Sequence, residues 1–243
     1  MDSLIFLSPA VARWYDLFNT SRADTDFYLN RVMSAGSVLD VGCGTGVILR
    51  EARAAGHTGR LCGIDPAPAM LDIARQRSDI EWVEGDAASI TWRSAFDLVI
   101  MTGHAFQELD TDEGLHAALT AMRGALRPDG RLVFETRNPQ ARAWERWTPE
   151  HAREVVAPGG ARARMEHQLQ RWDGDCVEFT ATFTGTDWNQ PQVSRSRLRF
   201  VDVAVLDRFL AEAGLTVEQR YGDWDGSALN SDSIEIITVA RPR

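Results

Sequence analysis

The sequence predicts an α/β fold in which a doubly wound parallel sheet is covered by helices on both faces. The first observation is that short apolar runs alternate with helical patterns through residues 37–136, which is the order of a sheet built from strand–helix–strand units. The second is a glycine-rich turn at residues 42–46, between an apolar run and a helical pattern. In such folds the crossovers are right-handed, and ligands bind outside the carboxyl ends of the strands.

Each element follows from a local pattern. Strands are expected where an apolar run is bounded by turn signals, and helices where apolar residues recur every third or fourth position. These rules place strands at residues 37–41, 60–64, 80–84, 96–101 and 131–136, and helices at residues 45–55, 67–77 and 112–126, with a turn at residues 127–130. Apolar and aromatic residues at helical spacing in residues 10–33 predict two short helices ahead of the first strand.

The alternation of strands and helices breaks after Asn138 and Pro139. Residues 162–172, 176–188 and 192–200 alternate like antiparallel strands and are separated by turn signals. The α/β pattern then resumes with a helix at residues 203–213 and strands at residues 216–221 and 234–240. We therefore expect an N-terminal helical lid (1–35), a core (36–145 and 201–243) and a small antiparallel β insertion (146–200) that caps a substrate.

Composition restricts the classes of function. The 243 residues fit one large domain, and 44% of them are hydrophobic, enough for a substantial core. Without a long apolar run or a basic leader we expect a cytoplasmic protein that does not contact membranes. The net charge of −9 disfavours nucleic acid as a partner. Scattered cysteines and histidines predict no metal site, and exposed insertion strands leave monomer and homodimer open.

The glycine-rich turn is the first candidate binding site. It lies in the segment VLDVGCGTG, where glycines permit tight turning and close approach of a ligand, and the helix that follows offers free N–H donors. Dinucleotide enzymes usually show GxGxxG, but position 47 is valine. The carboxylate of Asp40 before the turn suits a cationic ligand, such as a sulfonium with its ammonium group, and disfavours a pyrophosphate.

Two further acids follow the next two strands. Asp65 ends the second strand in the sequence GID, where a carboxylate can accept hydrogen bonds from both ribose hydroxyls. Asp86 follows the third strand in EGDA, where it can accept from an adenine amino group while the Ala87 N–H donates to a ring nitrogen. Asp65 could alternatively cap the next helix ahead of Pro66.

These segments together resemble the class I S-adenosylmethionine-dependent methyltransferases. VLDVGCGTG, GID, EGDA, FDLVIM and LRPDGRLVFETRNP occur in the family's order, and the resemblance covers roughly residues 38–139 and the closing strands. It implies a Rossmann-like sheet of seven strands, the last inserted antiparallel beside the fifth, and S-adenosylmethionine as the cofactor. It also implies an enzyme that methylates a nitrogen or oxygen of a small molecule.

The resemblance also assigns the cofactor site. By this resemblance, the three glycines of the turn lie along the methionine moiety, Asp65 binds the ribose and Asp86 binds the adenine. Met70 packs on the adenine face, although ordinary helix packing explains it equally well. The residues expected at the cofactor are Tyr15, Asp40, Gly42, Gly44, Gly46, Asp65, Pro66, Met70, Asp86, Ala87 and Thr102.

The substrate should lie where the fourth and fifth strands end, because the methyl group is expected there and the enzyme must align a nucleophile with it. His104 is the first candidate general base, with a structural histidine as the alternative and Glu108 as a second base. Arg137 could bind a substrate carboxylate or phosphate, or pair with an acid. The expected substrate residues are Tyr28, His104, Arg137 and Trp144, of which Trp144 could instead be core.

Two other functions compete with small-molecule methylation. A nicotinamide-dependent Rossmann oxidoreductase would share the glycine turn, but Val47, Asp40 and the antiparallel insertion count against it. A non-catalytic cofactor-binding subunit would not need the intact turn with both binding acids. The segment 222–226 with residues 231–233 resembles the endings of small-molecule methyltransferases, including N-methyltransferases of amino sugars.

Overall fold

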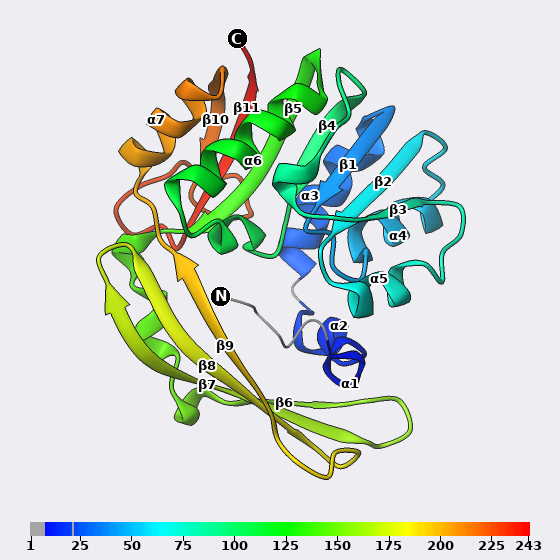
Figure 1. The fold of residues 1–243 in the computed structure, drawn as a ribbon, viewed down its shortest axis with the longest axis vertical. Coiled ribbons are helices and arrows are strands. Elements are labelled where there is room, and N and C mark those ends of the chain that lie inside the picture. The colour runs from blue at the N-terminus through cyan, green and yellow to red at the C-terminus, as the bar shows by residue number, and fades with distance from the viewer. Residues whose placement is uncertain (1–7, 21) are drawn as a thin grey trace.

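A seven-stranded sheet forms the centre of the computed structural model, which describes residues 8–20 and 22–243 (Figure 1). The strands lie in the order β10-β11-β5-β4-β1-β2-β3. Because β1 pairs in parallel with both β2 and β4, the strand order reverses beside β1, where ligands bind in folds of this kind. The strands are β1 (Ser37–Val41), β2 (Arg60–Asp65), β3 (Glu81–Glu84), β4 (Phe96–Met101), β5 (Leu126–Arg137), β10 (Leu215–Tyr221) and β11 (Glu235–Pro242).

Helices cover both faces of this sheet. Helices α3 (Arg22–Ser34) and α4 (Val47–Ala54) share one apolar cluster with one face, and α6 (Asp112–Ala125) and α7 (Val203–Glu212) share another with the opposite face. Strand β1 is buried along its whole length, as expected for a strand covered on both sides. The final strand, β11, inserts antiparallel between β5 and β10, which confirms the expected reversed hairpin.

A separate four-stranded antiparallel sheet forms the insertion, in the order β6-β7-β8-β9. Its strands are β6 (Arg153–Val156), β7 (Arg162–Asp173), β8 (Cys176–Gly185) and β9 (Gln192–Arg199). One face of this sheet is apolar, because Val177, Phe179, Ala181 and Phe183 alternate along β8 with polar residues.

The short helices α1 (Pro9–Ala12) and α2 (Tyr15–Phe18) pack on the apolar face of the insertion. Phe18 meets Phe183 edge to face, with ring centroids 5.8 Å apart, and Trp14 meets Trp188 at 6.1 Å. Figure 1 shows these helices between the central sheet and the insertion. Helices α1 and α2 and the insertion therefore form one packed unit that faces the ends of the core strands (Figure 1).

Three details of the expected secondary structure are wrong. Three helices, not two, precede β1 among the described residues. Residues 127–130 belong to β5 rather than to a turn, because Leu126 already pairs with Phe96 and a register shift in that pairing accommodates the Pro-Asp-Gly segment. The insertion contains the additional strand β6, whose four residues are too few for a clear alternation. Within the described residues, no helix has the length and apolar character needed to cross a membrane.

Candidate functional site

The glycine turn after β1 has the backbone that its sequence requires. Gly42, Gly44 and Gly46 have φ values of +70°, +55° and +74°, a region that other residues rarely adopt. A Cβ atom added to Gly44 would lie 3.4 Å from Cε of Met70 and 3.9 Å from Cε1 of Tyr15, so these two side chains stand close over the turn. At Gly46 the added atom would lie 2.2 Å from the Trp82 ring, and this glycine therefore also serves core packing.

Asp65 lies at the end of β2, with both carboxylate oxygens directed at backbone groups. Oδ2 accepts from the Gly44 N–H at 2.7 Å, and Oδ1 accepts from the Ala67 N–H at 2.8 Å. The carboxylate thus fixes the glycine turn and supports the start of helix α5 (Pro68–Ala74). Each oxygen retains a lone pair for a further donor.

The other expected cofactor residues surround this point. Met70 is buried against Ala12 and Tyr15, so the helix-packing alternative describes its present contacts. Asp86 is exposed and accepts from the Ser89 N–H at 2.8 Å, while Ala87 is buried beside it. Pro66 is exposed and Thr102 is half-buried. Adenine and ribose contacts of these residues stay predictions.

Three buried carboxyl groups, those of Asp40, Asp65 and Glu135, lie close together at the ends of the strands. Asp40 is buried, and its Oδ1 has no hydrogen-bond partner among the described residues. Burial, together with the nearby Asp65 and Glu135 carboxylates, raises the pKa of Asp40 well above its usual value. Burial also raises the pKa of Asp65 and of Glu135. Because buried carboxylates without counter-ions are unfavourable, this cluster suits a cationic ligand.

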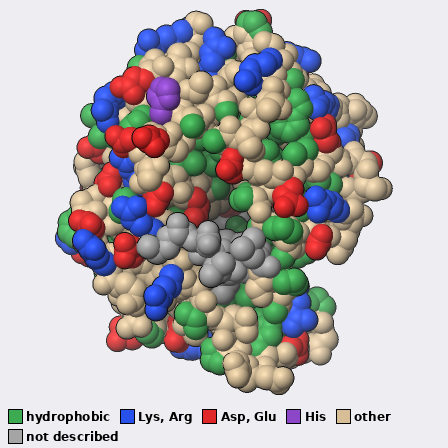
Figure 2. Space-filling view, viewed as in Figure 1, with side chains coloured by type: hydrophobic (Ala, Val, Ile, Leu, Met, Phe, Trp, Pro, Cys, Tyr) green, Lys and Arg blue, Asp and Glu red, His purple; other side chains and the backbone are tan. Residues whose placement is uncertain are grey.

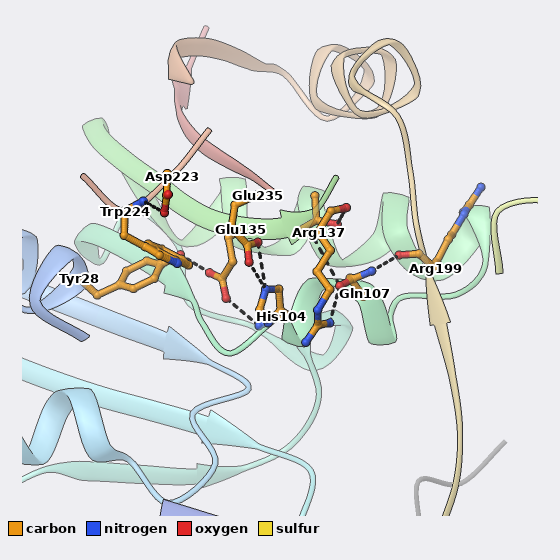
Figure 3. Close-up of polar contacts among 10 residues, drawn as sticks. Tyr28, His104, Gln107, Glu135, Arg137, Arg199, Asp223, Trp224 and Glu235 are labelled. Carbon is orange, nitrogen blue, oxygen red and sulfur yellow. Dashed lines mark hydrogen bonds and ion pairs between the residues drawn. The ribbon is translucent and has the colours of Figure 1, made fainter. Parts of the chain in front are cut away.

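Glu135 of β5 is a site residue that the sequence interpretation missed. It is buried, accepts a hydrogen bond from the hydroxyl of Tyr28 and accepts another from the His104 N–H at 2.6 Å. Figure 3 shows these side chains together at the ends of the strands. The Tyr28 hydroxyl therefore already donates its hydrogen bond to Glu135, and the Tyr28 ring lies against Trp224. Its expected substrate contact is not visible in this arrangement.

His104 lies after β4 with a left-handed backbone, φ +61°. Its ring Nε2 is 3.0 Å from both carboxylate oxygens of Glu235, at the start of β11 (Figure 3). Nδ1 has no hydrogen-bond partner among the described residues, and it is not sealed from solvent. Glu235 was also missed by sequence interpretation, because 131 residues separate it from His104. The pair leaves one ring nitrogen free for proton transfer.

Two other groups line the loop beside His104. Glu108 is exposed at the surface, and desolvation by the neighbouring protein, together with the nearby Asp110, raises its pKa to about 7. Tyr15 faces the same space, because its hydroxyl would lie 3.5 Å from a Cβ added to Gly103. Figure 2 shows the surface hollowed near the middle of the view, with acidic side chains around the hollow.

The substrate residues expected further along β5 lie in different surroundings. Arg137 donates from Nη1 to Oε1 of Gln107 at 2.8 Å and packs on Trp147. Trp144 is buried in the cluster beneath the insertion, where its ring meets Phe200 at 4.6 Å. The core alternative therefore describes the present contacts of Trp144, and Trp147 is the tryptophan that reaches Arg137.

Helix α2 is fastened to the glycine turn by polar contacts. Asp16 accepts from the Thr45 hydroxyl at 2.5 Å and from Nη2 of Arg50 at 2.7 Å. Thr45 is buried, and its carbonyl accepts from Nε of Arg50 at 2.9 Å. We call Asp16, Thr45 and Arg50 the lid latch, because they hold Tyr15 over the turn.

Breaking the lid latch is expected to weaken cofactor binding. In Arg50→Met the ion pair with Asp16 is lost, and a partly exposed pair contributes up to about 1 kcal/mol. We expect the Kd for S-adenosylmethionine to rise about threefold to fivefold by calorimetric titration. Arg75→Met, which removes an exposed pair with Asp72 on α5, should leave the Kd unchanged. Equal affinities for wild type and Arg50→Met would show that the latch does not support the site.

Comparison with known proteins points to one family. Residues 38–130 match a family model described as a methyltransferase domain. The chain is 28% identical to a cypemycin N-terminal methyltransferase of Streptomyces sp, over 86% of this chain and 84% of that protein. It is also 28% identical to a dTDP-3-amino-3,4,6-trideoxy-alpha-D-glucopyranose N,N-dimethyltransferase of Streptomyces venezuelae, over 88% of this chain and 94% of that protein.

Two further similarities differ in extent. A 2-phytyl-1,4-naphtoquinone methyltransferase of Thermosynechococcus vestitus is 35% identical over 50% of this chain, and the match spans only 56% of that protein. Among solved structures, DesVI of Streptomyces venezuelae superposes with a TM-score of 0.75 at 25% identity, covering 96% of this chain and 98% of that chain. The similarity to DesVI includes the insertion, because nearly the whole of both chains is aligned.

Proposed function

The chain belongs to the class I S-adenosylmethionine-dependent methyltransferases, and from that premise we propose that it methylates an amine of a small molecule held between the core and the insertion. The similarity to methyltransferases supports S-adenosylmethionine as the methyl donor and methyl transfer as the reaction. Two relatives with similarity over most of this chain are named as N,N-dimethyltransferases of dTDP-linked amino sugars, and a third is named as an N-terminal methyltransferase. These names support a nitrogen acceptor over an oxygen acceptor.

The acidic cluster carries this proposal, because it fits the methyl donor. The donor has two positive groups, a sulfonium and an ammonium, and the site offers Asp40 with an unpartnered buried oxygen. Asp65 and the backbone of the glycine turn lie beside it. The aromatic ring of Tyr15 covers the turn. A bound donor supplies an activated methyl group, so the protein needs mainly to position the acceptor and exclude water.

In our proposal, the insertion and helices α1 and α2 exclude water from the site. They form one apolar cluster that includes Trp14, Phe18 and Phe179. Because this cluster faces the ends of the core strands, it leaves an enclosed site suited to a small acceptor. The cap function of residues 146–200 is part of this proposal.

His104 is proposed as the base that takes the proton from the acceptor. Glu235 contacts Nε2, which fixes the ring and places the N–H on that nitrogen, so Nδ1 carries the free lone pair. Glu235 is a positioning residue in this scheme, because it acts through His104. Glu108, whose pKa of about 7 also suits proton transfer near neutral pH, is the second candidate.

Replacing the base should lower turnover and leave donor binding intact. His104→Asn is a suitable change because asparagine tolerates a left-handed backbone. We expect kcat to fall about 100-fold, and Glu235→Gln to lower kcat less, with unchanged Kd for S-adenosylmethionine in both. The exposed His116→Asn should match wild type. A loss of kcat in Glu108→Gln with none in His104→Asn would assign the base to Glu108.

The proposed function is tested by methyl transfer to a panel of small amines and matched alcohols. The purified protein is incubated with S-adenosylmethionine carrying an isotopically labelled methyl group, and products are identified by mass spectrometry. We expect label on an amine and none on the corresponding alcohol. Label on the alcohol alone would reverse the choice of acceptor atom. Bound donor without transfer to any acceptor would instead favour a non-catalytic cofactor-binding subunit.

A further inference from the structure

Arg137, at the end of β5, has a guanidinium with no carboxylate at ion-pairing distance among the described residues. It is accessible to solvent but surrounded by protein, and burial lowers its pKa despite the more distant charges of Glu235 and Glu135. Most arginines of this acidic chain have an acidic partner, as Arg197 does with Asp110 at 2.7 Å. A largely enclosed cation without a counter-ion is costly unless a ligand supplies the negative charge.

The guanidinium is held in one orientation by a fully buried amide. Gln107 accepts from Arg137 Nη1 through Oε1, and its own Nε2 donates to the Arg199 carbonyl at 2.9 Å (Figure 3). Arg199 belongs to β9 and is itself ion-paired with Asp112 and Asp175. The Arg137 side chain also lies against the Trp147 ring, 5.6 Å from its centroid. Because one Nη1 donor is engaged, the other guanidinium donors remain for a ligand.

The insertion contributes further basic groups to the same place. His167 on β7 lies near the Trp147 ring that Arg137 also contacts, with the two ring centroids 6.1 Å apart. Burial lowers the pKa of His167, and the charges of Arg137 and Arg153 lower it further. Arg153 on β6 donates to the Phe18 carbonyl, which directs it toward helix α2. The ring of His167 packs on Phe179, with centroids 5.4 Å apart. The basic groups therefore come from the core and from the insertion, across the space between them.

We propose that the acceptor carries an anionic group, a carboxylate or a phosphate, which binds to Arg137 with support from His167 and Arg153. This subsite rests on the proposed function, since it places the acceptor opposite the acidic residues that receive the donor. Arginine matches the oxygens of both anions with paired hydrogen bonds. The charge at the strand ends thus changes from negative at Asp40 and Asp65 to positive at Arg137, which in our proposal orients the acceptor with its amine toward the methyl group.

The subsite is tested by anion binding to the protein saturated with S-adenosylhomocysteine, the product of the donor. Inorganic pyrophosphate and acetate are titrated separately against wild type, Arg137→Gln and Arg137→Lys, with chemical shifts or calorimetry as the readout. We expect Arg137→Gln to raise the Kd of the preferred anion at least about tenfold, and Arg137→Lys to raise it less, because lysine keeps the charge. The exposed Arg195→Gln is the matched control and should bind like wild type.

The anion that loses affinity identifies the source, pyrophosphate indicating a phosphorylated acceptor and acetate indicating a carboxylate. The subsite would be overturned if neither anion binds, or if Arg137→Gln binds both as wild type does. Unchanged affinity for S-adenosylhomocysteine in every variant shows that each is folded and that the donor site is intact. Failure of wild type to bind S-adenosylhomocysteine would overturn the proposed function and this subsite together.

Discussion

Asp65→Ala is expected to weaken the binding of S-adenosylmethionine at least about 100-fold, the largest expected effect on donor affinity. The carboxylate can accept from two ribose hydroxyls, and each hydrogen bond to a charged group contributes about 1.5–3 kcal/mol. The same carboxylate holds the Gly44 N–H at 2.7 Å, so its loss also loosens the turn. Calorimetric titration measures the change, with Asp72→Ala as the control because Asp72 is an exposed acid of the adjacent helix.

The helix-cap interpretation of Asp65 makes a different prediction for the same variant. Asp65 accepts from the Ala67 N–H, and loss of a cap costs about 0.5–2 kcal/mol of stability. If capping were its only role, Asp65→Ala would unfold at a lower temperature but bind the donor with wild-type affinity. Thermal unfolding and titration of the same sample therefore separate the two roles.

Asp40→Asn is expected to stabilise the free protein while weakening donor binding. The folded protein raises the pKa of Asp40 by burial, with Asp65 and Glu135 adding to the effect. As pH rises above the unfolded value of about 3.9, the unfolded chain releases this proton before the folded chain does, so stability falls. Asparagine has no such loss. The variant should therefore melt higher than wild type near neutral pH, and the gain should vanish below about pH 4.

The affinity of Asp40→Asn should change in the opposite direction. Loss of a charged partner for the cationic donor is expected to raise the Kd about 10- to 100-fold. Asp97 on β4 is the matched control: burial would raise its pKa, but hydrogen bonds from Ser37 and Arg127 keep that pKa below its usual value. Asp97→Asn should lose stability near neutral pH and keep its affinity. Lower stability together with full affinity in Asp40→Asn would contradict the role given to this carboxylate.

Local sequence patterns predicted most of the core fold. Strand β4 has the expected bounds, and the glycine turn lies between β1 and α4 as the segment VLDVGCGTG indicated. Errors arose where pairing decides the structure, as at residues 127–130, which belong to β5 because Leu126 before them and Arg131 after them both pair with β4. Strand β6 forms through its pairing with β7. Its four residues are too few to show a strand pattern in the sequence.

The candidate site was predictable only where its residues follow strands in sequence. Asp40 and Asp65 lie in recognisable motifs near the ends of their own strands. Glu235, in contrast, reaches His104 only because β11 inserts beside β5. Gln107 is a second example, since its partners lie on β5 and β9. Acids at strand ends, including Glu135 within FETRNP, were the available signal, but only the fold shows which of them converge.

The most direct test of the account is calorimetric titration of the wild-type protein with S-adenosylmethionine and, separately, with NADH. The acidic cluster of Asp40, Asp65 and Glu135 predicts micromolar binding of the cationic donor and no binding of the anionic dinucleotide. Binding of NADH without binding of S-adenosylmethionine by the folded protein would contradict the account and support a nicotinamide-dependent oxidoreductase instead.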